Sequence, residues 1–402
     1  MTKAPLWSTL MEVDQRAGDD AERLPLLSVS KSHGIVRYAE LFPDRAVRAQ
    51  DHRHYKTAMA GDIILNKMSA ATGAVGCSPE PGLVSPDYAV LRTMGTSDAH
   101  YLTYLLGSDF FCRDVVAPML RGIGTGESSN VRTPRVSLGD YLSAAVYLPA
   151  VGVQLQVVEF LDRETAEIDA MDAELDWLIQ TLQERRGASI ESVLANTGRR
   201  TKLGYFVDTL AGYAFPANQF SRDDREIRLL RGVNIKPQGT DWREAAFWPA
   251  AQTDGLGRYM LQPGDVVLGM DRPFVGNGTR VVILTHEDLP ALLLQRVLRL
   301  RPASNGSPEF LRLLLMTKEF ENYVTPESTG ISVPHISEGQ VLDFSVAIPS
   351  AVEQQSLAEK VLSELGEVDG MIADAQKLKA LLAERRSTLI TEIVTGKKEV
   401  PA

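Results

Sequence analysis

The 402-residue sequence is poor in cysteine and has no long apolar run. Cys77 and Cys112 are too few for a disulfide framework or a thiolate metal site, so we expect both to pack in a core. No uninterrupted apolar stretch approaches the roughly 18 residues that a membrane-spanning helix requires. The first residues, with Lys3, Glu12 and Asp14, lack the apolar core of a signal peptide. These absences predict a soluble protein of the reducing cytoplasm.

Motifs of catalysis and cofactor binding are also missing. Gly122 and Gly124 resemble the start of a dinucleotide fingerprint, but Glu127 stands where its third glycine is needed. Thr391 occupies the position of the first glycine of a P-loop that would end at Gly396. The sequence has no Gly-x-Ser-x-Gly, no metalloprotease helix motif, no Asn/Asp-Pro-Pro-Tyr/Phe signature of an adenine methyltransferase and no cluster with metal-ligand spacing. We therefore expect no catalytic residue, cofactor or metal in this chain.

The sequence does contain an internal repeat, in which residues 149–198 return as residues 349–396. The two copies align without a gap at an offset of 200 residues up to Arg186 and Arg386, and each closes on Thr-Gly. Matching positions include Pro149/Pro349, Gln154/Gln354, Glu159/Glu359, Glu164/Glu364, Asp169/Asp369, Leu182/Leu382 and Glu184-Arg185-Arg186/Glu384-Arg385-Arg386. A period of half the chain predicts a duplicated architecture.

Each copy has the pattern of one long helix that pairs with another. Apolar residues recur every seven positions, with a second apolar position three residues after some of them, which is the a/d pattern of a coiled coil. Glu164 and Glu364 interrupt one d position in each copy. Two unrelated amphipathic surface helices are the alternative, which the matching registers disfavour. The predicted pairing residues are Leu161, Ile168, Met171, Leu175, Leu178 and Leu182 in the first copy, and Val361, Val368, Met371, Leu378 and Leu382 in the second.

The net charge of −10 is concentrated in these helices. Residues 151–198 carry ten acidic and three basic side chains, and residues 351–396 carry eight acidic and five basic ones. The rest of the chain is therefore neutral overall. Because salt screens exposed charges within about 10 Å, a nucleic-acid surface on the remaining segments need not oppose a negative field.

The two blocks outside the helices share a frame. Both mix short apolar runs with turn residues, which predicts α/β or α+β domains. Gly61-Asp62-Ile63 is echoed by Gly264-Asp265-Val266, and Arg135-Val136-Ser137 lies 200 residues before His335-Ile336-Ser337. Between these landmarks the blocks differ strongly. The pattern predicts two copies of one domain that contact different targets.

The order of domain, helix, similar domain, helix predicts an antiparallel helix pair and a pseudo-twofold axis. The fold class is then α/β (α+β), with two similar globular domains separated by two long antiparallel coiled-coil helices. The predicted boundaries are 1–148, 149–198, 199–348 and 349–402. About 38 residues of helix at roughly 1.5 Å each give a spacer of about 57 Å, or some 17 base pairs of duplex.

At this point the chain resembles a known family, the specificity subunits of type I restriction–modification enzymes. The motifs that carry the resemblance are Leu148-Pro149 with Gln154, the run 158–169, Leu182-Gln-Glu-Arg-Arg186, Ile348-Pro349 with Glu353-Gln354-Gln355, and the run 382–396. In that family the helices are shared regions, and the preceding blocks are target-recognition domains. The resemblance covers essentially the whole chain, although Gly366 and Gly370 lower the helix propensity of the second copy.

The resemblance implies a non-catalytic subunit that reads a bipartite, asymmetric site in double-stranded DNA. The helices would set the spacing of the half-sites and dock two methyltransferase (modification) subunits. Those partners bind S-adenosylmethionine and flip the target adenine out of the duplex. Restriction subunits, which are nuclease-translocases that use ATP and Mg²⁺, can join them.

Basic and amide side chains in turn-rich segments suit phosphate contact and the reading of base edges. An ordinary solvated loop and a protein-binding adaptor with a coiled-coil spacer stay open as alternatives, and half of a fused restriction enzyme acting alone is disfavoured by the missing catalytic motifs. The candidate DNA-binding residues are Lys31, Lys67, Arg121, Ser128, Asn130, Arg132 and Arg135 in the first block, and Asn234, Lys236, Arg243, Arg272, Asn277, Arg280, Thr329 and His335 in the second.

Overall fold

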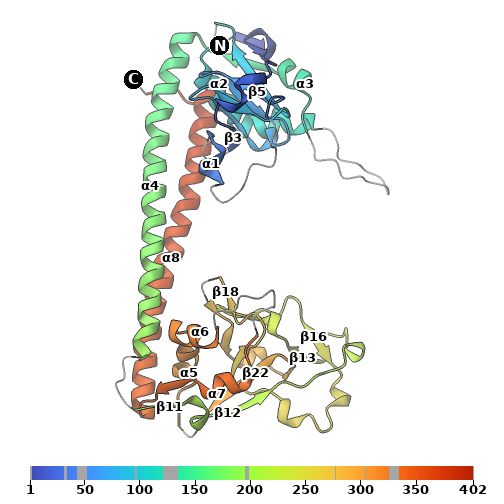
Figure 1. The fold of residues 1–402 in the computed structure, drawn as a ribbon, viewed down its shortest axis with the longest axis vertical. Helices are drawn as coiled ribbons and strands as arrows, with labels where there is room; N and C mark the ends of the chain where they lie inside the picture. The colour runs from blue at the N-terminus through green and yellow to red at the C-terminus, as the bar shows by residue number, and fades with distance from the viewer. Residues whose placement is uncertain are drawn as a thin grey trace. The chain divides into compact units, whose positions relative to one another are not determined.

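A computed structural model describes residues 2–30, 34–42, 52–95, 97–120, 135–194, 199–276, 278–303, 305–325 and 335–401. The chain forms two compact units, unit 1 (Met1–Leu175 with Lys377–Ala402) and unit 2 (Asp176–Gln376). Two long helices, α4 (Val151–Glu191) and α8 (Ala351–Val394), each begin in one unit and end in the other (Figure 1). The units thus divide the chain within the helices, whereas the sequence placed domain boundaries at the helix ends, and those boundaries stay a prediction.

Unit 1 contains a four-stranded antiparallel sheet in the order β2-β9-β6-β7. Its strands are β2 (Leu10–Glu12), β9 (Tyr88–Thr93), β6 (Ile63–Asn66) and β7 (Val75–Cys77). Antiparallel ladders join β1 (Thr2–Pro5) to β10 (Ala145–Leu148), β3 (Leu27–Ser30) to β4 (Gly34–Arg37), and β5 (Lys56–Ala58) to β8 (Gly82–Val84). The helices are α1 (Tyr38–Leu41), α2 (Ala99–Gly107) and α3 (Leu138–Ser143).

Unit 2 repeats this plan with the sheet β12-β22-β17-β20. Its strands are β12 (Val207–Ala211), β22 (Val297–Pro302), β17 (Val266–Gly269) and β20 (Val281–Ile283), and β11 (Arg200–Lys202) pairs with β23 (Ser345–Ala347) as β1 does with β10. Further strands are β13 (Ile227–Leu230) between β16 (Ala246–Trp248) and β21 (Ala291–Leu293), β14 (Ile235–Lys236) with β15 (Gly239–Thr240), and β18 (Phe274–Val275) with β19 (Gly278–Thr279). The helices are α5 (Pro308–Leu315), α6 (Lys318–Val324) and α7 (Glu338–Asp343).

The Gly-Asp echo in the sequence marks the same turn in both sheets. Gly61 and Gly264 adopt left-handed φ angles of 88° and 86°, which glycine reaches without a Cβ clash. The following Asp62 is 1% exposed and accepts both Nε (2.7 Å) and Nη2 (2.8 Å) of Arg92 on β9. This hydrogen-bonded pairing raises the pKa of Arg92. A buried carboxylate is tolerated here because it is paired and hydrogen-bonded.

The same arrangement recurs in unit 2. Asp265 is 2% exposed and accepts Nε and Nη2 of Arg301 on β22, with Nη2 at 3.0 Å. Each aspartate also accepts a main-chain N–H three residues before it, from Met59 and Gln262 respectively, at 2.8 Å. The duplication predicted from the sequence therefore extends to individual hydrogen bonds.

A glutamine fixes the start of each long helix to its own unit. Gln154 donates to the Pro149 carbonyl (2.9 Å) and accepts the N–H of Asp98, which caps α2 (2.8 Å). Gln354 donates to the Pro349 carbonyl (2.9 Å) and accepts the N–H of Ser307, which caps α5 (3.1 Å). Each amide thus joins a long helix to the start of a short one.

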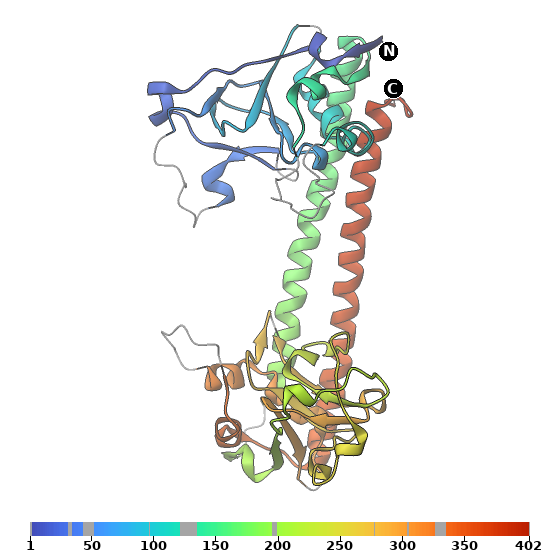
Figure 2. The same ribbon diagram turned by 90° about the vertical axis from the view of Figure 1, so that its right-hand side faces the viewer.

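The long helices pair antiparallel within each unit (Figures 1 and 2). In unit 1 Arg386 lies 3.2 Å from Asp169, and Lys379 lies 3.1 Å from Asp172. In unit 2 Arg186 lies 2.8 Å from Asp369, which is the same pair as Arg386–Asp169 moved by 200 residues. Numbers rise along one helix as they fall along the other, so the coiled-coil topology expected from the heptads is confirmed.

The pairing face differs from the predicted a/d seam in its second row. The first row is buried, with Leu161, Ile168, Leu182, Val361, Val368 and Leu382 inside and Leu175 half-buried. Met171, Leu178, Met371 and Leu378 are instead 46%, 39%, 51% and 47% exposed. The second row lies one residue further on, because Asp172, Arg186, Lys379 and Arg386 make the ion pairs across the seam. These four apolar residues are therefore not buried in the seam, and their role in pairing the helices stays a prediction.

Each unit has its own apolar core, and the long helices contribute to both. Val157, Phe160 and Leu161 of α4 and Ile390 and Val394 of α8 join the core of unit 1. In unit 2 the core includes Ile190, Val193, Ala358, Val361 and Leu365. Across the part of the chain that the structure describes, no helix has the length and apolarity needed to cross a membrane.

Candidate nucleic-acid interface

Both units bring a predicted DNA-binding segment back to the end of a central strand. In unit 1 the N–H of Val136 donates to the carbonyl of Lys67 (3.1 Å), which places Arg135 beside the end of β6. In unit 2 the N–H of Ile336 donates to the carbonyl of Met270 (3.0 Å), just after β17. We call these places the unit 1 junction (66–69 with 135–136) and the unit 2 junction (269–272 with 335–336). The structure thus gathers Lys67 with Arg135, and Arg272 with His335.

The unit 2 junction carries a cluster of exposed polar side chains. Asp271 forms an antiparallel bridge with His335, and its Oδ1 lies 2.8 Å from His335 Nδ1. Arg296 Nη1 lies 3.3 Å from the same carboxylate oxygen and 3.3 Å from His335 Nδ1. Asp271 therefore holds two potential donors side by side at the surface.

The backbone at this cluster is strained. Arg272 (φ 45°) and Arg296 (φ 67°) are the non-glycine residues with positive φ among those that the structure describes. Such a conformation costs about 1–3 kcal/mol for a side-chain-bearing residue and is found mostly at functional sites. The strain at Arg296 is balanced locally, because its carbonyl accepts the N–H of Met270 at 2.9 Å.

Arg280 supports the junction from inside. Its Nη1 donates to the carbonyls of Asp271 (2.9 Å) and Arg272 (3.5 Å), and its Nε donates to the carbonyl of Ile235 (3.0 Å). Burial lowers the pKa of Arg280 from its ordinary value. The guanidinium is thus occupied by main-chain oxygens, which gives Arg280 a positioning role.

The unit 1 junction has the same frame and different side chains. Counting from the Gly-Asp turns, Met68 occupies the position of Asp271, and Ser69 that of Arg272. Asp87 precedes β9 as Arg296 precedes β22. A position that offers a cation in unit 2 therefore offers an anion in unit 1.

Two predicted residues of unit 2 lie outside the junction. Lys236 ends β14, one residue after the Ile235 carbonyl that Arg280 binds. Arg243 is exposed, and its Nε and Nη2 donate to the two carboxylate oxygens of Asp241 at 3.0 and 2.7 Å. These hydrogen bonds hold the pKa of Asp241 down at about 2.

The prediction that Asn234 contacts DNA is wrong. Asn234 is 0% exposed, and its Oδ1 accepts the N–H of Arg231 (3.1 Å) while its Nδ2 donates to the carbonyl of Asp241 (2.9 Å). An asparagine in a turn can either cap the local backbone or face a ligand, and the sequence alone does not separate the two. The remaining predicted residues lie outside those that the structure describes: Lys31, Arg121, Ser128, Asn130, Arg132, Asn277 and Thr329.

The sequence does not mark Asp271 and Arg296 as candidate site residues. They stand 25 residues apart in the chain and meet only through the pairing of β17 with β22. Arg296 follows no turn dipeptide, so nothing in the sequence announces its left-handed backbone. One signal in the sequence points to Arg296. It is a polar residue directly before β22, the strand that pairs with the Gly-Asp strand β17.

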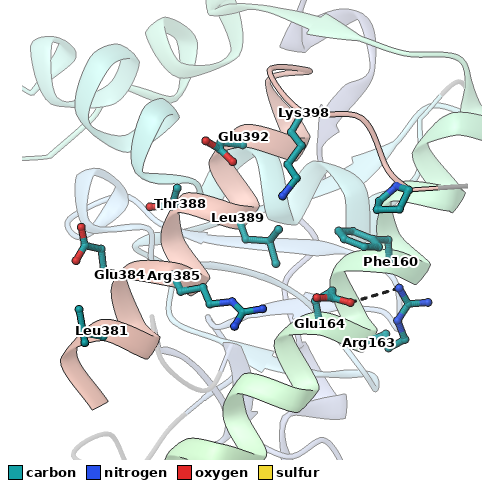
Figure 3. Close-up of a pocket in the computed structure, with 11 residues that line it drawn as sticks. Phe160, Arg163, Glu164, Leu381, Glu384, Arg385, Thr388, Leu389, Glu392 and Lys398 are labelled. Atoms are coloured by element: carbon teal, nitrogen blue, oxygen red, sulfur yellow. Dashed lines mark hydrogen bonds and ion pairs between the residues drawn. The ribbon is translucent and has the colours of Figure 1, made fainter. Parts of the chain in front are cut away.

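A groove between α4 and α8 in unit 1 is a second surface feature, with a volume of about 550 Å³ (Figure 3). Phe160 and Leu389 contribute apolar walls, while Glu164 from α4 and Arg385 from α8 extend into the space between the helices. No group of side chains in the described ranges has the composition of a metal site. The groove is lined by both apolar and charged side chains.

Comparison with known proteins agrees with this architecture. No family model matches the chain. It is 31% identical over 189 residues to the type I restriction enzyme EcoAI specificity subunit of Escherichia coli, covering 46% of this chain and 30% of that protein. It is 27% identical over 200 residues to the MjaVIII specificity subunit of Methanocaldococcus jannaschii, covering 50% and 46%. The matches thus span less than half the length of these curated relatives.

Two solved structures share the fold across nearly the whole chain. A chain from a type I R-M system, solved to explain its complex assembly and conformational transition, superposes with a TM-score of 0.67, 14% identity and coverage of 99% and 98%. The HsdS subunit from Thermoanaerobacter tengcongensis gives a TM-score of 0.55, 15% identity and coverage of 99% and 97%.

The chain shares its fold with these solved chains. Its sequence is similar to those of type I restriction enzyme specificity subunits, and the two comparisons together confirm the resemblance and the fold class inferred from the helix motifs.

Proposed function

We propose that the chain is the DNA-binding specificity subunit of a type I restriction–modification complex and reads a bipartite, asymmetric site, one half with each unit. The observation that carries the proposal is the duplicated frame with unlike junctions. The buried Asp62–Arg92 and Asp265–Arg301 pairs are equivalent, while Asp87 and Arg296 at matching surface positions have opposite charge.

A duplicated scaffold with different surface chemistry suits a target made of two different halves. If both units bound the same ligand, the junction positions would need the same donors and acceptors. DNA half-sites differ in the donors and acceptors that their base edges present, so the reading residues must differ too. The chain itself would be non-catalytic and would act in the cytoplasm.

The exposed apolar residues of the long helices support docking of two copies of one partner. Met171 and Leu378 lie in unit 1, and their 200-residue counterparts Met371 and Leu178 lie in unit 2. Each unit thus shows the same methionine and leucine, one from each helix. We propose that modification subunits cover these pairs and bring S-adenosylmethionine, and that restriction subunits using ATP and Mg²⁺ join the assembly.

The test is to co-express the chain with the modification subunit encoded beside it and to sequence the host genome for methylated adenines. The expected result is a two-part motif separated by a fixed run of unspecified bases. A complex that forms without such a motif would refute the recognition role and support a protein-binding adaptor.

A further inference from the structure

In the unit 2 junction, the edge of the Arg296 guanidinium formed by Nε and Nη2 is available to bind a ligand. The contacts of Arg296 with Asp271 and His335 involve Nη1 alone. Within the described ranges, Nε and Nη2 of Arg296 have no hydrogen-bonding partner. These two atoms carry parallel N–H groups that match the O6 and N7 acceptors of guanine in the major groove.

Two other exposed arginines of unit 2, Arg225 and Arg243, have this edge occupied. Arg225 donates from Nε and Nη2 to both oxygens of Asp223, at 3.0 and 2.7 Å. Arg243 does the same with Asp241. In both cases the carboxylate lies two residues away in sequence and accepts hydrogen bonds from both Nε and Nη2. At Arg296 the carboxylate of Asp271 contacts Nη1 instead, so Nε and Nη2 stay available for a ligand.

The side chain is also held before any ligand arrives. The Arg296 carbonyl is bound to the N–H of Met270, and the Asp271 carboxylate holds Nη1 from the neighbouring segment. Arg280 fixes the carbonyls of Asp271 and Arg272 in turn. An arginine ordered in this way loses less rotamer freedom on binding, which favours a specific contact over a loose one.

The charges fit a place next to DNA. An unpaired carboxylate would be repelled by the phosphate backbone, but Asp271 is paired with Arg296 and His335 and lies next to Arg272. The unit 1 junction has Asp87 at the corresponding position, which offers no donor in its ionised form. The arrangement is therefore specific to one unit.

We propose that Arg296 reads a guanine in the half-site of unit 2, with Asp271 as the residue that positions it. This inference rests on the proposed DNA-binding function. His335 lies against the same carboxylate oxygen and completes the holder. The ligand is a guanine edge of duplex DNA, seen as one required G·C pair in one half of the motif.

The experiment uses the full chain with its modification subunits and compares methylation of duplexes that carry single base-pair changes. Arg296→Gly removes the side chain at a φ of 67°, which glycine adopts freely, so this variant keeps the fold. We expect it to lower the preference for one G·C pair of one half-site by about 10- to 100-fold, the size of one bidentate base contact. The preference at the other half-site stays as in the wild type.

Two further variants separate reading from charge and from positioning. Arg296→Lys keeps the charge without the fork, so we expect overall DNA affinity to persist while the preference for that G·C pair is lost. Asp271→Asn weakens the preference at the same base pair alone, whereas a merely structural role would weaken the whole half-site evenly. Arg225→Ala, an exposed and paired arginine of the same unit, serves as the control and leaves the motif unchanged.

Three results would overturn the inference while the proposed function stands. They are a wild-type bipartite motif that Arg296→Gly leaves unchanged, an even loss across all positions with a shallower salt dependence as for a phosphate contact, and a change at an A·T pair. If the wild type yields no bipartite motif at all, the proposed function itself fails.

Discussion

Units 1 and 2 share their interior and differ at their edges. The Gly-Asp turn, the buried aspartate with its arginine, and the glutamine at the helix start recur atom for atom. The junctions instead hold Met68 and Asp87 in one unit and Asp271 and Arg296 in the other. Buried polar pairs, which tolerate little change, therefore set the frame, while exposed junction positions can vary with the ligand.

Breaking the shared frame should have the largest effect. Arg92→Ala leaves the Asp62 carboxylate buried without its partner, and we expect a loss of about 2–3 kcal/mol in the free energy of unfolding. This is below the roughly 3–5 kcal/mol of a fully buried pair because Arg92 is half-exposed. Arg301→Ala should cost unit 2 a similar amount. Thermal and denaturant unfolding measure both losses.

The control for this pair is a double variant. Asp62→Asn combined with Arg92→Ala removes the charge as well as its partner, so part of the lost stability should return. If the single and double variants are equally unstable, the cost comes from lost packing of the arginine and the pair does not hold the frame.

Changing a junction residue of unit 1 should affect recognition of one half-site. Arg135 is exposed beside the Lys67 carbonyl, so Arg135→Ala leaves the core intact. We expect roughly a 5- to 10-fold weaker preference for the half-site of unit 1, the size of one lost contact, with no change at the other. Competition between duplexes altered in one half at a time measures it. Equal weakening at both halves would contradict the assignment of one half-site to each unit.

Removing either copy of the ion pair between the long helices should lower the free energy of unfolding by the same small amount. Arg186→Ala and Arg386→Ala each remove one copy of the same ion pair, with Asp369 and Asp169 respectively. Because these pairs are largely exposed, each loss should be about 0.5 kcal/mol and should shrink at high salt. Unequal losses beyond measurement error would show that the two seams are not equivalent. Denaturant unfolding at two salt concentrations is the measurement.

The smallest effect is expected at Asp241 in unit 2. The pKa of Asp241 in the folded protein is about 2, below its ordinary value of 3.8, so its stabilising contribution is present above about pH 4 and is lost as the pH falls toward 2. Arg243→Ala removes the donors and should return the pKa of Asp241 toward its ordinary value. A titration followed by NMR at the Asp241 carboxylate measures the shift. An unchanged pKa would show that other groups hold it down.

The sequence predicts the duplicated parts well because they are periodic or local. Heptads reveal α4 and α8, and the Gly-Asp pairs mark β6 and β17, since both depend on neighbours within a few residues. The heptads also predict that Met171 and Leu178 are buried in the seam, but both are substantially exposed. Burial in this row depends on the register of the opposite helix, which the local pattern does not contain.

The junctions are harder to predict because they form between distant segments. Asp271 and Arg296 meet through strand pairing, and Asn234 is taken up by backbone groups that a turn pattern does not show. Residue type alone therefore selects Lys67, Arg135, Arg272 and His335, which the structure places at the junctions, but it does not select Asp271 and Arg296. A polar side chain positions its neighbours when its hydrogen-bonding atoms are already bound within the unit, and it can contact a ligand when those atoms are free.

The chain segments that form each unit also determine the order in which the units are completed during translation. Unit 2 is one uninterrupted stretch, Asp176–Gln376, whereas unit 1 joins Met1–Leu175 to Lys377–Ala402. Ile390, Ile393 and Val394 complete the core of unit 1, and the Val394 carbonyl accepts the hydroxyl of Tyr101 at 3.3 Å. These residues leave the ribosome only after all of unit 2. Unit 1 is therefore the first unit to begin translation and the last to be completed. Until its last segment is translated, the core of unit 1 lacks Ile390, Ile393 and Val394, and the apolar residues that they cover stay exposed.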